Sequence, residues 1–296
     1  MTAVELAAYL EAKALLDQRS LNLQVFELFC EVLGGFPEAA IVDLGTGTGA
    51  MLRRLALTAL NPALILTGVE REAALVGAAL GCCQQVLASA GWKLNPTGDG
   101  FEAKRGECWR RFHFVCADCF EFAPAGPCHA VCAHTFMDLV PLAKTLDLLS
   151  GWLTPGGVFY ASCNYDGGTT LFPVSSDPVF EAELLARYHR SMESRRLDGE
   201  MTGGALCGRR LYQALVAGGW EILSFGSSDW NLTPVRRSYR GADALVLEAL
   251  LAMIRSEGGG LEQRALEDWH KERLEQLKAG RLGLIIHQLD LLAARP

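Results

Sequence analysis

A glycine-rich heptapeptide at residues 43–49, Asp-Leu-Gly-Thr-Gly-Thr-Gly, constrains the fold of this chain more than any other feature. It follows a short apolar run at 39–42 and precedes apolar residues at helical spacing over 50–60, which Asn61-Pro62 ends. The pattern predicts a buried strand, a tight turn and a helix. Because glycine has no Cβ, such a turn lets a ligand approach the main chain closely, and we expect it to bind a cofactor.

The same alternation continues along the chain. Short apolar runs predict strands at 64–70, 112–117, 129–133 and 158–163, and longer runs predict helices at about 73–90 and 139–153. Strands that alternate with helices are typical of a parallel sheet with helices on both faces. With 296 residues, 50% of them hydrophobic, the chain can bury such a core without disulfides. The sequence therefore predicts an α/β fold.

The flanking segments are predicted to be mostly helical. One or two helices are expected over 4–33, a charged helical stretch over 173–201 and a helical pattern from residue 242 to the end. Two short runs at 220–225 and 229–233, joined by Gly-Ser-Ser, predict an antiparallel hairpin at the sheet edge. Residues 95–106 are predicted to be a mobile loop. The expected division is an N-terminal helical cap (1–36), a core (37–235) with a helical insertion at about 173–206, and a C-terminal helical extension (236–296).

The charge balance and the cysteines limit the classes of partner and compartment. The formal net charge is −7, which argues against a broad nucleic-acid surface because such surfaces depend on clustered positive charge. No apolar stretch reaches 18 uninterrupted residues, so no membrane span is predicted. The ten cysteines lie mostly in apolar runs, and no charged-then-apolar signal segment precedes the fold. We therefore expect a reducing compartment and a cytoplasmic protein.

Three acidic residues surround the predicted turn. Asp43 would be an awkward neighbour for a pyrophosphate and suits a cationic ligand instead. Glu70 ends the second predicted strand, where a carboxylate can accept both hydrogen bonds of a ribose diol. Asp118 can accept from an adenine amino group while Cys119 or Phe120 lines the ring. The three acids predict a nucleoside pocket, although a purely structural constellation is the alternative.

These residues resemble the class I S-adenosylmethionine-dependent methyltransferases. The resemblance is carried by VDLGTGTG at 42–49, TGVER at 67–71, VCADCFEF at 115–122, AHTFMDLV at 133–140 and LTPGGVFYAS at 153–162. It covers about residues 37–235, and the N-terminal pattern AYLEAKALLDQRSLN is similar to an unassigned bacterial subgroup. It implies a Rossmann-like, seven-stranded, mostly parallel sheet with an antiparallel last strand.

The resemblance also implies S-adenosyl-L-methionine as the cofactor. Glu70 would hold the ribose, Asp118 and Cys119 the adenine, and the turn at 45–49 the methionine part, with Asp43 near the sulfonium or amino group. The residues expected to bind the cofactor are Asp43, Gly45, Thr46, Gly47, Gly49, Glu70, Arg71, Asp118, Cys119, Phe120, His134 and Thr135.

Three residues are candidates for the chemistry of methyl transfer. His134, after the fourth predicted strand, has a pKa range suited to a general base, and the alternative is a histidine satisfied by a backbone carbonyl. Asn164 and Tyr165 follow the fifth predicted strand and could orient an acceptor, or could belong to a simple turn. The Asn/Asp-Pro-Pro-Tyr/Phe motif of many amino-methylating enzymes is absent from residues 133–140. This difference weighs against methylation of bases or protein glutamine.

The methyl acceptor is predicted to be a small, partly hydrophobic molecule, methylated on oxygen or nitrogen. Arg19, Asn22, Arg209 and Arg210 are candidates to bind it, or else form exposed helix faces. No metal site is predicted, because Cys116 and Cys119, and Cys128 and Cys132, fit buried apolar thiols better than ligands. A homodimer is expected, without a discriminating residue.

Three other functions remain as alternatives to methyl transfer. They are aminopropyl transfer, non-catalytic binding of S-adenosylmethionine, and a nicotinamide-dependent oxidoreductase, which Asp43 and the order of the glycines disfavour.

Overall fold

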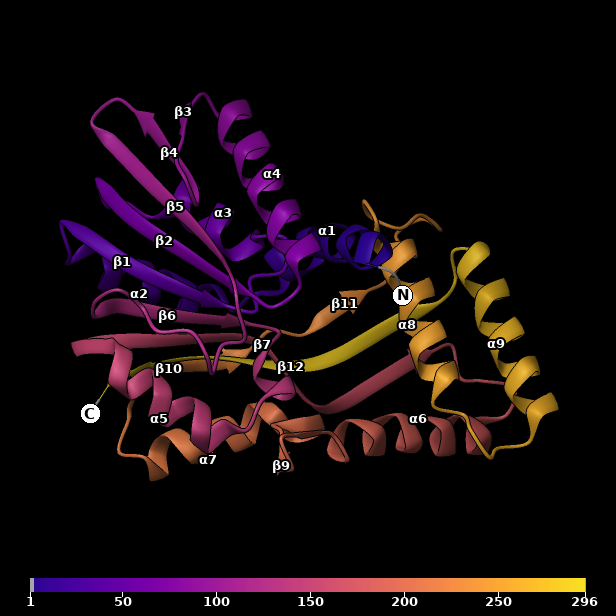
Figure 1. The fold of residues 1–296 in the computed structure, drawn as a ribbon. Helices are drawn as coiled ribbons and strands as arrows, with labels where there is room; N and C mark the ends of the chain where they lie inside the picture. The colour runs from indigo at the N-terminus through magenta and orange to yellow at the C-terminus, as the bar shows by residue number, and fades with distance from the viewer. Residues whose placement is uncertain (1–2, 296) are drawn as a thin grey trace.

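A central sheet of ten strands organises the protein, whose computed structural model describes residues 3–295 (Figure 1). The spatial order is β10-β12-β7-β6-β1-β2-β5-β4-β3, and β11 also pairs with β12. The strands are β1 (Glu38–Leu44), β2 (Ala63–Glu70), β3 (Lys93–Pro96), β4 (Gly100–Arg105), β5 (Cys108–Cys116), β6 (Cys128–His134), β7 (Leu153–Phe172), β10 (Glu221–Ser227), β11 (Trp230–Leu232) and β12 (Gly283–Ala294).

Strands β7, β6, β1, β2 and β5 run parallel to one another, and β12 runs antiparallel to both β7 and β10. The predicted α/β class, a Rossmann-like and mostly parallel sheet with helices on both faces, is therefore confirmed. The sheet has ten strands where seven were expected, because β3, β4 and β11 are added to it, and β4 runs antiparallel to β5 as β12 does to β7. Because β1 has β2 on one side and β6 on the other, the direction of winding reverses at β1. Ligands of open α/β sheets bind beyond the carboxyl ends of the strands at such a reversal.

Helices cover both faces of the sheet and one of its ends. They are α1 (Ala3–Ser20), α2 (Leu23–Gly34), α3 (Ala50–Thr58), α4 (Ala73–Ser89), α5 (Leu142–Trp152), α6 (Pro178–Glu193), α7 (Cys207–Ala217), α8 (Asp243–Ser256) and α9 (Gln263–Lys278), with short 3-10 turns η1 (Met137–Leu139) and η2 (Gly204–Leu206). A two-stranded hairpin, β8 (Arg196–Leu197) and β9 (Glu200–Met201), follows α6.

The alternation of side chains along the strands separates two cores. Ile41 belongs to the cluster packed by α2, α3 and α4, whereas its neighbour Val42 belongs to the cluster packed by α5 and α7. Successive residues of a strand point to opposite faces of a sheet. A strand between two helical layers must therefore be apolar at nearly every position, and all four residues from Ile41 to Leu44 are buried.

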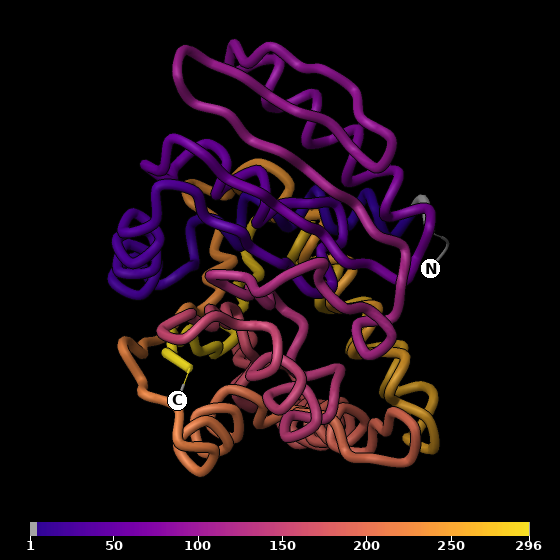
Figure 2. Tube along the Cα trace, turned by 60° about the vertical axis from the view of Figure 1, so that its left-hand side comes forward, coloured from indigo at the N-terminus to yellow at the C-terminus, as the bar shows by residue number. Residues whose placement is uncertain are grey.

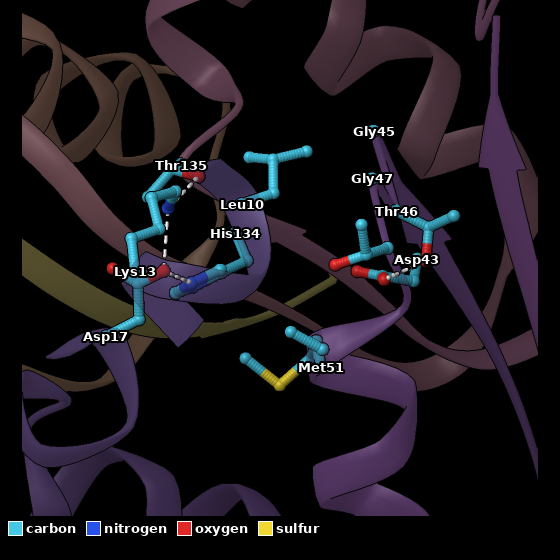
Figure 3. A pocket seen from close by; sticks show the side chains of 12 residues that line it. Leu10, Lys13, Asp17, Asp43, Gly45, Thr46, Gly47, Met51, His134 and Thr135 are labelled. Atoms are coloured by element: carbon cyan, nitrogen blue, oxygen red, sulfur yellow. Dashed lines mark hydrogen bonds and ion pairs between the residues drawn. The ribbon is translucent and has the colours of Figure 1, made fainter. Parts of the chain in front are cut away.

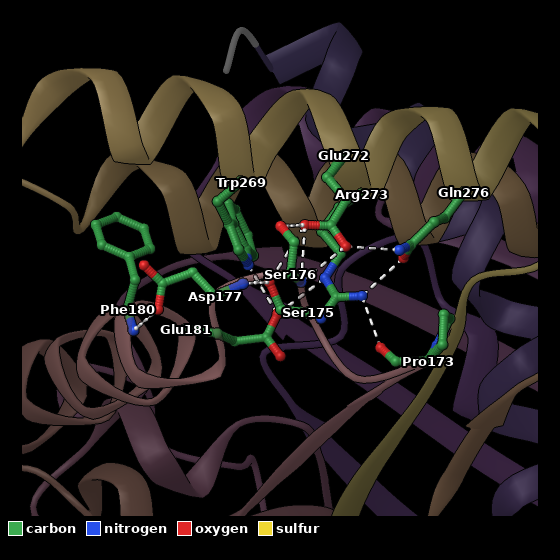
Figure 4. A network of polar contacts seen from close by, with 10 residues as sticks. All are labelled: Pro173, Ser175, Ser176, Asp177, Phe180, Glu181, Trp269, Glu272, Arg273 and Gln276. Carbon is green, nitrogen blue, oxygen red and sulfur yellow. Dashed lines mark hydrogen bonds and ion pairs between the residues drawn. The ribbon is translucent and has the colours of Figure 1, made fainter.

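A third core lies where helices α1, α6, α8 and α9 meet the ends of β7 and β12 (Figure 1). Its polar part is a buried network centred on Arg273 of α9, whose side chain is fully buried (Figure 4). Arg273 Nε donates to Glu181 Oε2 of α6 at 2.8 Å, and its Nη1 donates to the carbonyl of Pro173 at 2.8 Å. Trp269 Nε1 donates to the same Glu181 oxygen at 2.7 Å. The network ties α6 and α9 to the segment that follows β7.

The C-terminal segment differs from the prediction. The expected helical pattern holds for α8 and α9, but residues 283–294 form β12, which lies in the sheet between β7 and β10. Nine of the twelve residues of this strand are buried, because helices cover it on both sides. A short apolar run of this kind, interrupted only by His287, Gln288 and Asp290, does not distinguish a buried strand from a buried helix by periodicity. The antiparallel strand thus comes from the end of the chain.

Two other local predictions are wrong. The runs at 220–225 and 229–233 do not pair with each other, since β10 and β11 each pair with β12. The segment 95–106 is not a mobile loop, because most of it forms β3 and β4, which extend the sheet antiparallel to β5. Figure 2 shows this hairpin at the outer edge of the molecule. In both cases the partner strand comes from outside the predicted unit: β12 pairs with β10 and β11, and β5 pairs with β4.

The end of one predicted strand also needs correction. Residues 164–168, expected as a loop after the fifth strand, lie inside β7, which continues to Phe172. Of the predicted cap at 1–36, residues 1 and 2 lie outside the described part, α1 and α2 confirm two helices, and α2 packs in a sheet core rather than over a site. The inserted segment contains α6 and the β8–β9 hairpin. Residue 296 of the predicted C-terminal extension also lies outside the described part.

All ten cysteines are free thiols, and most are buried. Within residues 3–295, none of the helices combines the length and apolar character needed to cross a bilayer.

Candidate functional site

Two adjacent cavities open at the carboxyl ends of β1, β2, β5 and β6. The larger has a volume of about 490 Å³ and is lined by Leu6, Leu10, Gly45, Gly47, Val69, Glu70, Arg71, Glu72, Leu75, Ala117, Asp118, Cys119, Thr135, Phe136, Leu139, Val140, Arg195, Arg196, Leu197 and Thr202. The smaller, about 40 Å³, is lined by Leu10, Lys13, Asp17, Asp43, Gly45, Thr46, Gly47, Thr48, Ala50, Met51, His134 and Thr135 (Figure 3). Helix α1 contributes to both.

The glycine turn forms the floor shared by the two cavities. Thr46 N donates to the carbonyl of Val69 at 3.1 Å, and Gly47 N donates to Glu70 Oε2 at 3.1 Å, so the turn is fastened to the end of β2. Gly45 has a φ of 60°, and a Cβ there would lie 2.3 Å from Cδ2 of Phe136. Only glycine satisfies both the backbone conformation and this close packing. The sequence prediction of a strand, a tight turn and a helix is confirmed at this turn.

Glu70 and Asp118 project from neighbouring strand ends into the larger cavity. Glu70 Oε1 also accepts a hydrogen bond from the main-chain N of Glu72 at 3.1 Å, which orients the carboxylate. Asp118 Oδ1 accepts from the main-chain N of Phe120 at 2.9 Å. Apolar side chains, including those of Val69 and Leu75, line the space near Glu70. The arrangement offers hydrogen-bond acceptors and apolar contacts in one cavity.

The structure brings together ten of the twelve residues expected to bind a cofactor. Gly49 and Phe120 line neither cavity. Gly49 caps α3 at a φ of 78°, where a Cβ would lie 2.8 Å from Cys83 Sγ, so its role is to allow α3 to pack against α4. The ring of Phe120 lies near the ammonium of Lys144, 4.3 Å from its centroid.

Asp43 is a buried carboxylate at the start of the turn. Its Oδ2 accepts a hydrogen bond from Thr46 Oγ1 at 2.6 Å, while its buried Oδ1 has no hydrogen-bond partner among residues 3–295. Burial raises the pKa of Asp43 to about 6, the charge of Glu70 acts in the same direction, and the bond from Thr46 and the charge of His134 oppose it. A buried acceptor without a partner favours a ligand that donates hydrogen bonds or carries positive charge.

Asp43 should make the unliganded protein less stable as the pH rises from 5 to 7. The folded-state pKa of about 6 lies above the ordinary value of 3.8, so in this window the folded state binds more protons than the unfolded state and the free energy of unfolding falls with pH. We expect wild type to lose about 1 kcal/mol relative to Asp43→Asn. Urea denaturation of both proteins at pH 5, 6 and 7 measures this difference, and parallel pH profiles would contradict it.

Two charged residues that line the smaller cavity escaped the sequence prediction, Lys13 and Asp17 of α1. Lys13 Nζ lies 2.6 Å from Asp17 Oδ2 and donates to Thr135 Oγ1 at 3.3 Å, and both side chains are nearly fully buried. Burial opposes ionisation of Asp17, but Lys13 and His134 outweigh it and lower the pKa of Asp17 to about 2. Asp17 is therefore a buried carboxylate facing the glycine turn (Figure 3).

A signal for Lys13 and Asp17 was present in the sequence. Leu10, Lys13 and Asp17 are spaced three and four residues apart, which places them on one face of a helix. That face begins with apolar residues, so it must pack on the rest of the protein. Lys and Asp are almost never fully buried unless they are paired, so this spacing on a packed face could have predicted an ion pair.

His134 lies at the end of β6 with both ring nitrogens engaged. Its Nε2 is 3.1 Å from Asp17 Oδ2, and its Nδ1 is 2.8 Å from Ser162 Oγ. A ring in this state has no free lone pair that could take a proton from a bound substrate. The imidazole can therefore serve as a general base only after its contact with Asp17 is exchanged for a contact with the substrate.

Asn164 and Tyr165 line neither cavity. Asn164 is buried in β7, where its Nδ2 donates to the carbonyl of Leu289 at 2.9 Å. The hydroxyl of Tyr165 contacts Thr169 Oγ1 at 2.8 Å and His189 Nε2 at 2.7 Å. Both side chains are used in contacts within the fold.

The four candidates for acceptor binding also lie outside the two cavities. Asn22 caps α2 by accepting from Val25 N. Arg209 donates through Nε and Nη2 to the carboxylate of Asp166, at 2.9 and 2.8 Å, and Arg210 pairs with Glu193 at 2.8 Å. Arg19 pairs with Asp243 and lines a third, polar cavity of about 250 Å³, which shares no lining residue with the first two.

No model of a protein family and no curated protein matches the chain. Solved structures do match it. YjhP from E. coli is 18% identical, with 97% of this chain and 99% of that chain covered and a TM-score of 0.49. A SAM-dependent methyltransferase from Geobacter sulfurreducens in complex with S-adenosyl-L-homocysteine is 13% identical, with coverages of 94% and 92% and a TM-score of 0.49. One from Thiobacillus denitrificans, also with S-adenosyl-L-homocysteine, is 15% identical, with coverages of 93% and 93% and a TM-score of 0.48.

Proposed function

We propose that the protein transfers a methyl group from S-adenosyl-L-methionine to oxygen or nitrogen of a small, partly hydrophobic metabolite. The observation that carries the proposal is the pair of cavities at the reversal point of the sheet, with acids at Asp43, Glu70 and Asp118 around one glycine turn. A volume of about 490 Å³ is within the usual range for a small-molecule site.

The larger cavity would hold the adenosine part of the cofactor. The Glu70 carboxylate would accept hydrogen bonds from the two ribose hydroxyls, and Asp118 would accept from the adenine amino group. Apolar contacts to the ring would come from Val69, Leu75 and Cys119, all of which line this space. Acceptors at both ends and apolar walls between them suit a nucleoside.

The smaller cavity would receive the methionine part, beside Gly45 and Gly47. The sulfonium and the α-amino group of S-adenosylmethionine are cations, and two buried carboxylates, Asp43 and Asp17, line this end. Each of them has one oxygen without a hydrogen-bond partner in the described part of the chain. Opposite charge in a buried site favours binding of these cations.

The same features disfavour a nicotinamide dinucleotide. A pyrophosphate binds to free main-chain N–H groups of a glycine turn, but the N–H of Gly47 is already donated to Glu70. The buried carboxylate of Asp43 would add repulsion to a bound anion.

The acceptor would approach the methyl group beside His134 and Thr135. Once a substrate replaces its contact with Asp17, His134 can take a proton from the attacking group. Helix α1 and the segment with Arg195, Arg196, Leu197 and Thr202 line the cavities, and this enclosure together with the net charge of −7 favours a small acceptor over a nucleic acid. Asn164 and Tyr165 have no part in this step.

Isothermal titration with S-adenosylmethionine, S-adenosylhomocysteine and a nicotinamide dinucleotide tests the cofactor. We expect saturable binding of the first two and none of the third. A panel of small hydroxyl and amine compounds, assayed for release of S-adenosylhomocysteine, then tests the transfer.

Absence of S-adenosylmethionine binding by folded protein would overturn the proposal. Turnover with the decarboxylated cofactor alone would replace methyl transfer with aminopropyl transfer, and binding without any turnover would favour a non-catalytic role. The cytoplasmic location, which the ten free thiols support, and a homodimer belong to the same proposal, and light scattering of the purified protein tests the dimer.

A further inference from the structure

Three side chains with metal-binding atoms converge beside the smaller cavity. Asp17 comes from α1, His134 from the end of β6 and Cys163 from β7, and one ligand atom from each lies within 4.8 Å of the other two. An ion at the centre of such a triangle would lie within roughly 2.8 Å of each atom, so small side-chain movements reach the ~2.0–2.3 Å bonds of zinc. Carboxylate, imidazole and thiolate are the zinc ligands found in proteins.

The histidine is held in the orientation that a metal ligand needs. Its Nδ1 is 2.8 Å from the hydroxyl of Ser162, a fully buried residue. In the structure Nε2 lies 3.1 Å from Asp17 Oδ2 and donates its hydrogen to that carboxylate. A bound cation would displace this proton, and with Nδ1–H then donating to Ser162 the lone pair of Nε2 would lie on the side of the cluster. Metal-binding histidines use their other ring nitrogen in this way, and the contact fixes both tautomer and ring orientation.

The cysteine is presented by a bulge in the sheet. Residues 161 and 164 of β7 pair with residues 291 and 289 of β12, so Ser162 and Cys163 face the single residue Asp290. Cys163 has a φ of 54°, and its N donates to Asp290 Oδ1 at 2.6 Å. A bulge redirects a side chain from its regular alternation, and the buried carboxylate of Asp290 holds this unusual backbone in place.

The charge around the cluster favours a cation. Three carboxylates, Asp17, Asp43 and Asp290, are buried here. The ammonium of Lys13 pairs with Asp17 Oδ2 at 2.6 Å, but the buried Oδ1 of Asp17 has no hydrogen-bond partner in the part of the chain that the structure describes. One carboxylate oxygen is therefore left for an ion, and the excess of buried negative charge offsets repulsion from Lys13.

We propose that Asp17, His134 and Cys163 bind a zinc ion and leave its fourth coordination position open toward the smaller cavity. The set differs from the cysteine pairs 116/119 and 128/132, for which the sequence predicts no metal. A zinc ion with three protein ligands can bind a water, hydroxyl or thiol in the fourth position and lower the pKa of the bound group. The inference goes beyond the proposed function and does not require it. With the ion bound, Asp17 and His134 are its ligands, so deprotonation of the acceptor would depend on the metal instead of His134, and Asp43 is the carboxylate that remains for the cations of the cofactor.

Metal titration of the full-length protein tests the site without any cofactor. After treatment with a chelator, the protein is titrated with Zn²⁺ in competition with a chromophoric chelator, and separately with Co²⁺ to detect the thiolate-to-metal absorption band. We expect one Zn²⁺ per chain. Cys163→Ser and Asp17→Asn should each weaken binding at least tenfold, and Cys163→Ser should abolish the Co²⁺ band.

The matched control is Cys116→Ser, which removes an exposed thiol outside the cluster and should bind Zn²⁺ as wild type does. Thermal melting of each variant verifies folding. Should Cys163→Ser prove unstable, the test relies on Asp17→Asn, which keeps the size of the side chain. Sub-stoichiometric binding by wild type, or equal binding by wild type and both variants, would overturn the proposal. Because no S-adenosylmethionine is present, these results are independent of the cofactor titration.

Discussion

A Glu70→Ala protein should bind S-adenosylmethionine at least tenfold more weakly than wild type, a loss of about 1.4 kcal/mol or more. In the proposed complex the carboxylate accepts from two ribose hydroxyls, and hydrogen bonds to a charged group contribute about 1.5–3 kcal/mol each. The variant also loses the hydrogen bond from Gly47 N to Glu70 Oε2, which attaches the glycine turn to the end of β2. Isothermal titration of both proteins measures the change.

Glu38→Gln is the matched control for the loss of one negative charge. Glu38 begins β1 and is exposed, whereas Glu70 ends β2, so the two residues lie at opposite edges of the same parallel pair. The control should bind the cofactor as wild type does. Equal affinity of Glu70→Ala and wild type would remove Glu70 from the site and would contradict the proposed position of the ribose.

An Arg273→Met protein should lose about 3–5 kcal/mol of its free energy of unfolding. The guanidinium is fully buried, with donors to Glu181, to the carbonyl of Pro173 and to Gln276 Oε1 at 2.7 Å (Figure 4). Methionine fills much of the same space but leaves the buried Glu181 carboxylate without its countercharge. Removing one partner of a buried pair costs much more than the pair contributes in total. Urea denaturation, followed by circular dichroism, measures the loss.

Two further variants separate this effect from loss of a surface charge. Arg264→Met changes an exposed residue of the same helix, whose Nε lies 3.9 Å from Asp268 Oδ2. This variant should change the free energy of unfolding by no more than about 0.5 kcal/mol. Arg273→Met combined with Glu181→Leu removes both charges and should recover most of the loss. A double variant no more stable than Arg273→Met would mean that packing around Arg273, rather than the unpaired carboxylate, carries the effect.

The core of the fold could be predicted because its signals are local. The run from Ile41 to Gly49 contains its own strand, turn and helix start, and the apolar positions of the strand must be buried whatever surrounds them. Glu70 and Asp118 follow their strands directly, and the carboxyl ends of parallel strands meet at one edge. The two acids therefore had to face the same space as the turn, as the larger cavity confirms.

The pairing of the outer segments could not be predicted in this way. The runs at 220–225 and 229–233 have the length and turn residues of a hairpin. In the structure both pair with β12 instead, and β12 is held in the sheet by its long pairing with β7. Residues 95–106 carry little apolar pattern of their own and become strands because β5 offers a free edge.

The class of sheet, the glycine turn and the acids that follow the strands could all be predicted, because each depends on residues that are neighbours in the chain. Long-range packing determines that 283–294 is a strand inside the sheet, that Asn164 and the two arginines at 209 and 210 make contacts outside the cavities, and that Lys13 and Asp17 line the same cavity as the turn. These outcomes depend on which distant segments compete for the same pairing edge or the same buried charge, and this competition is settled only when the whole core is packed.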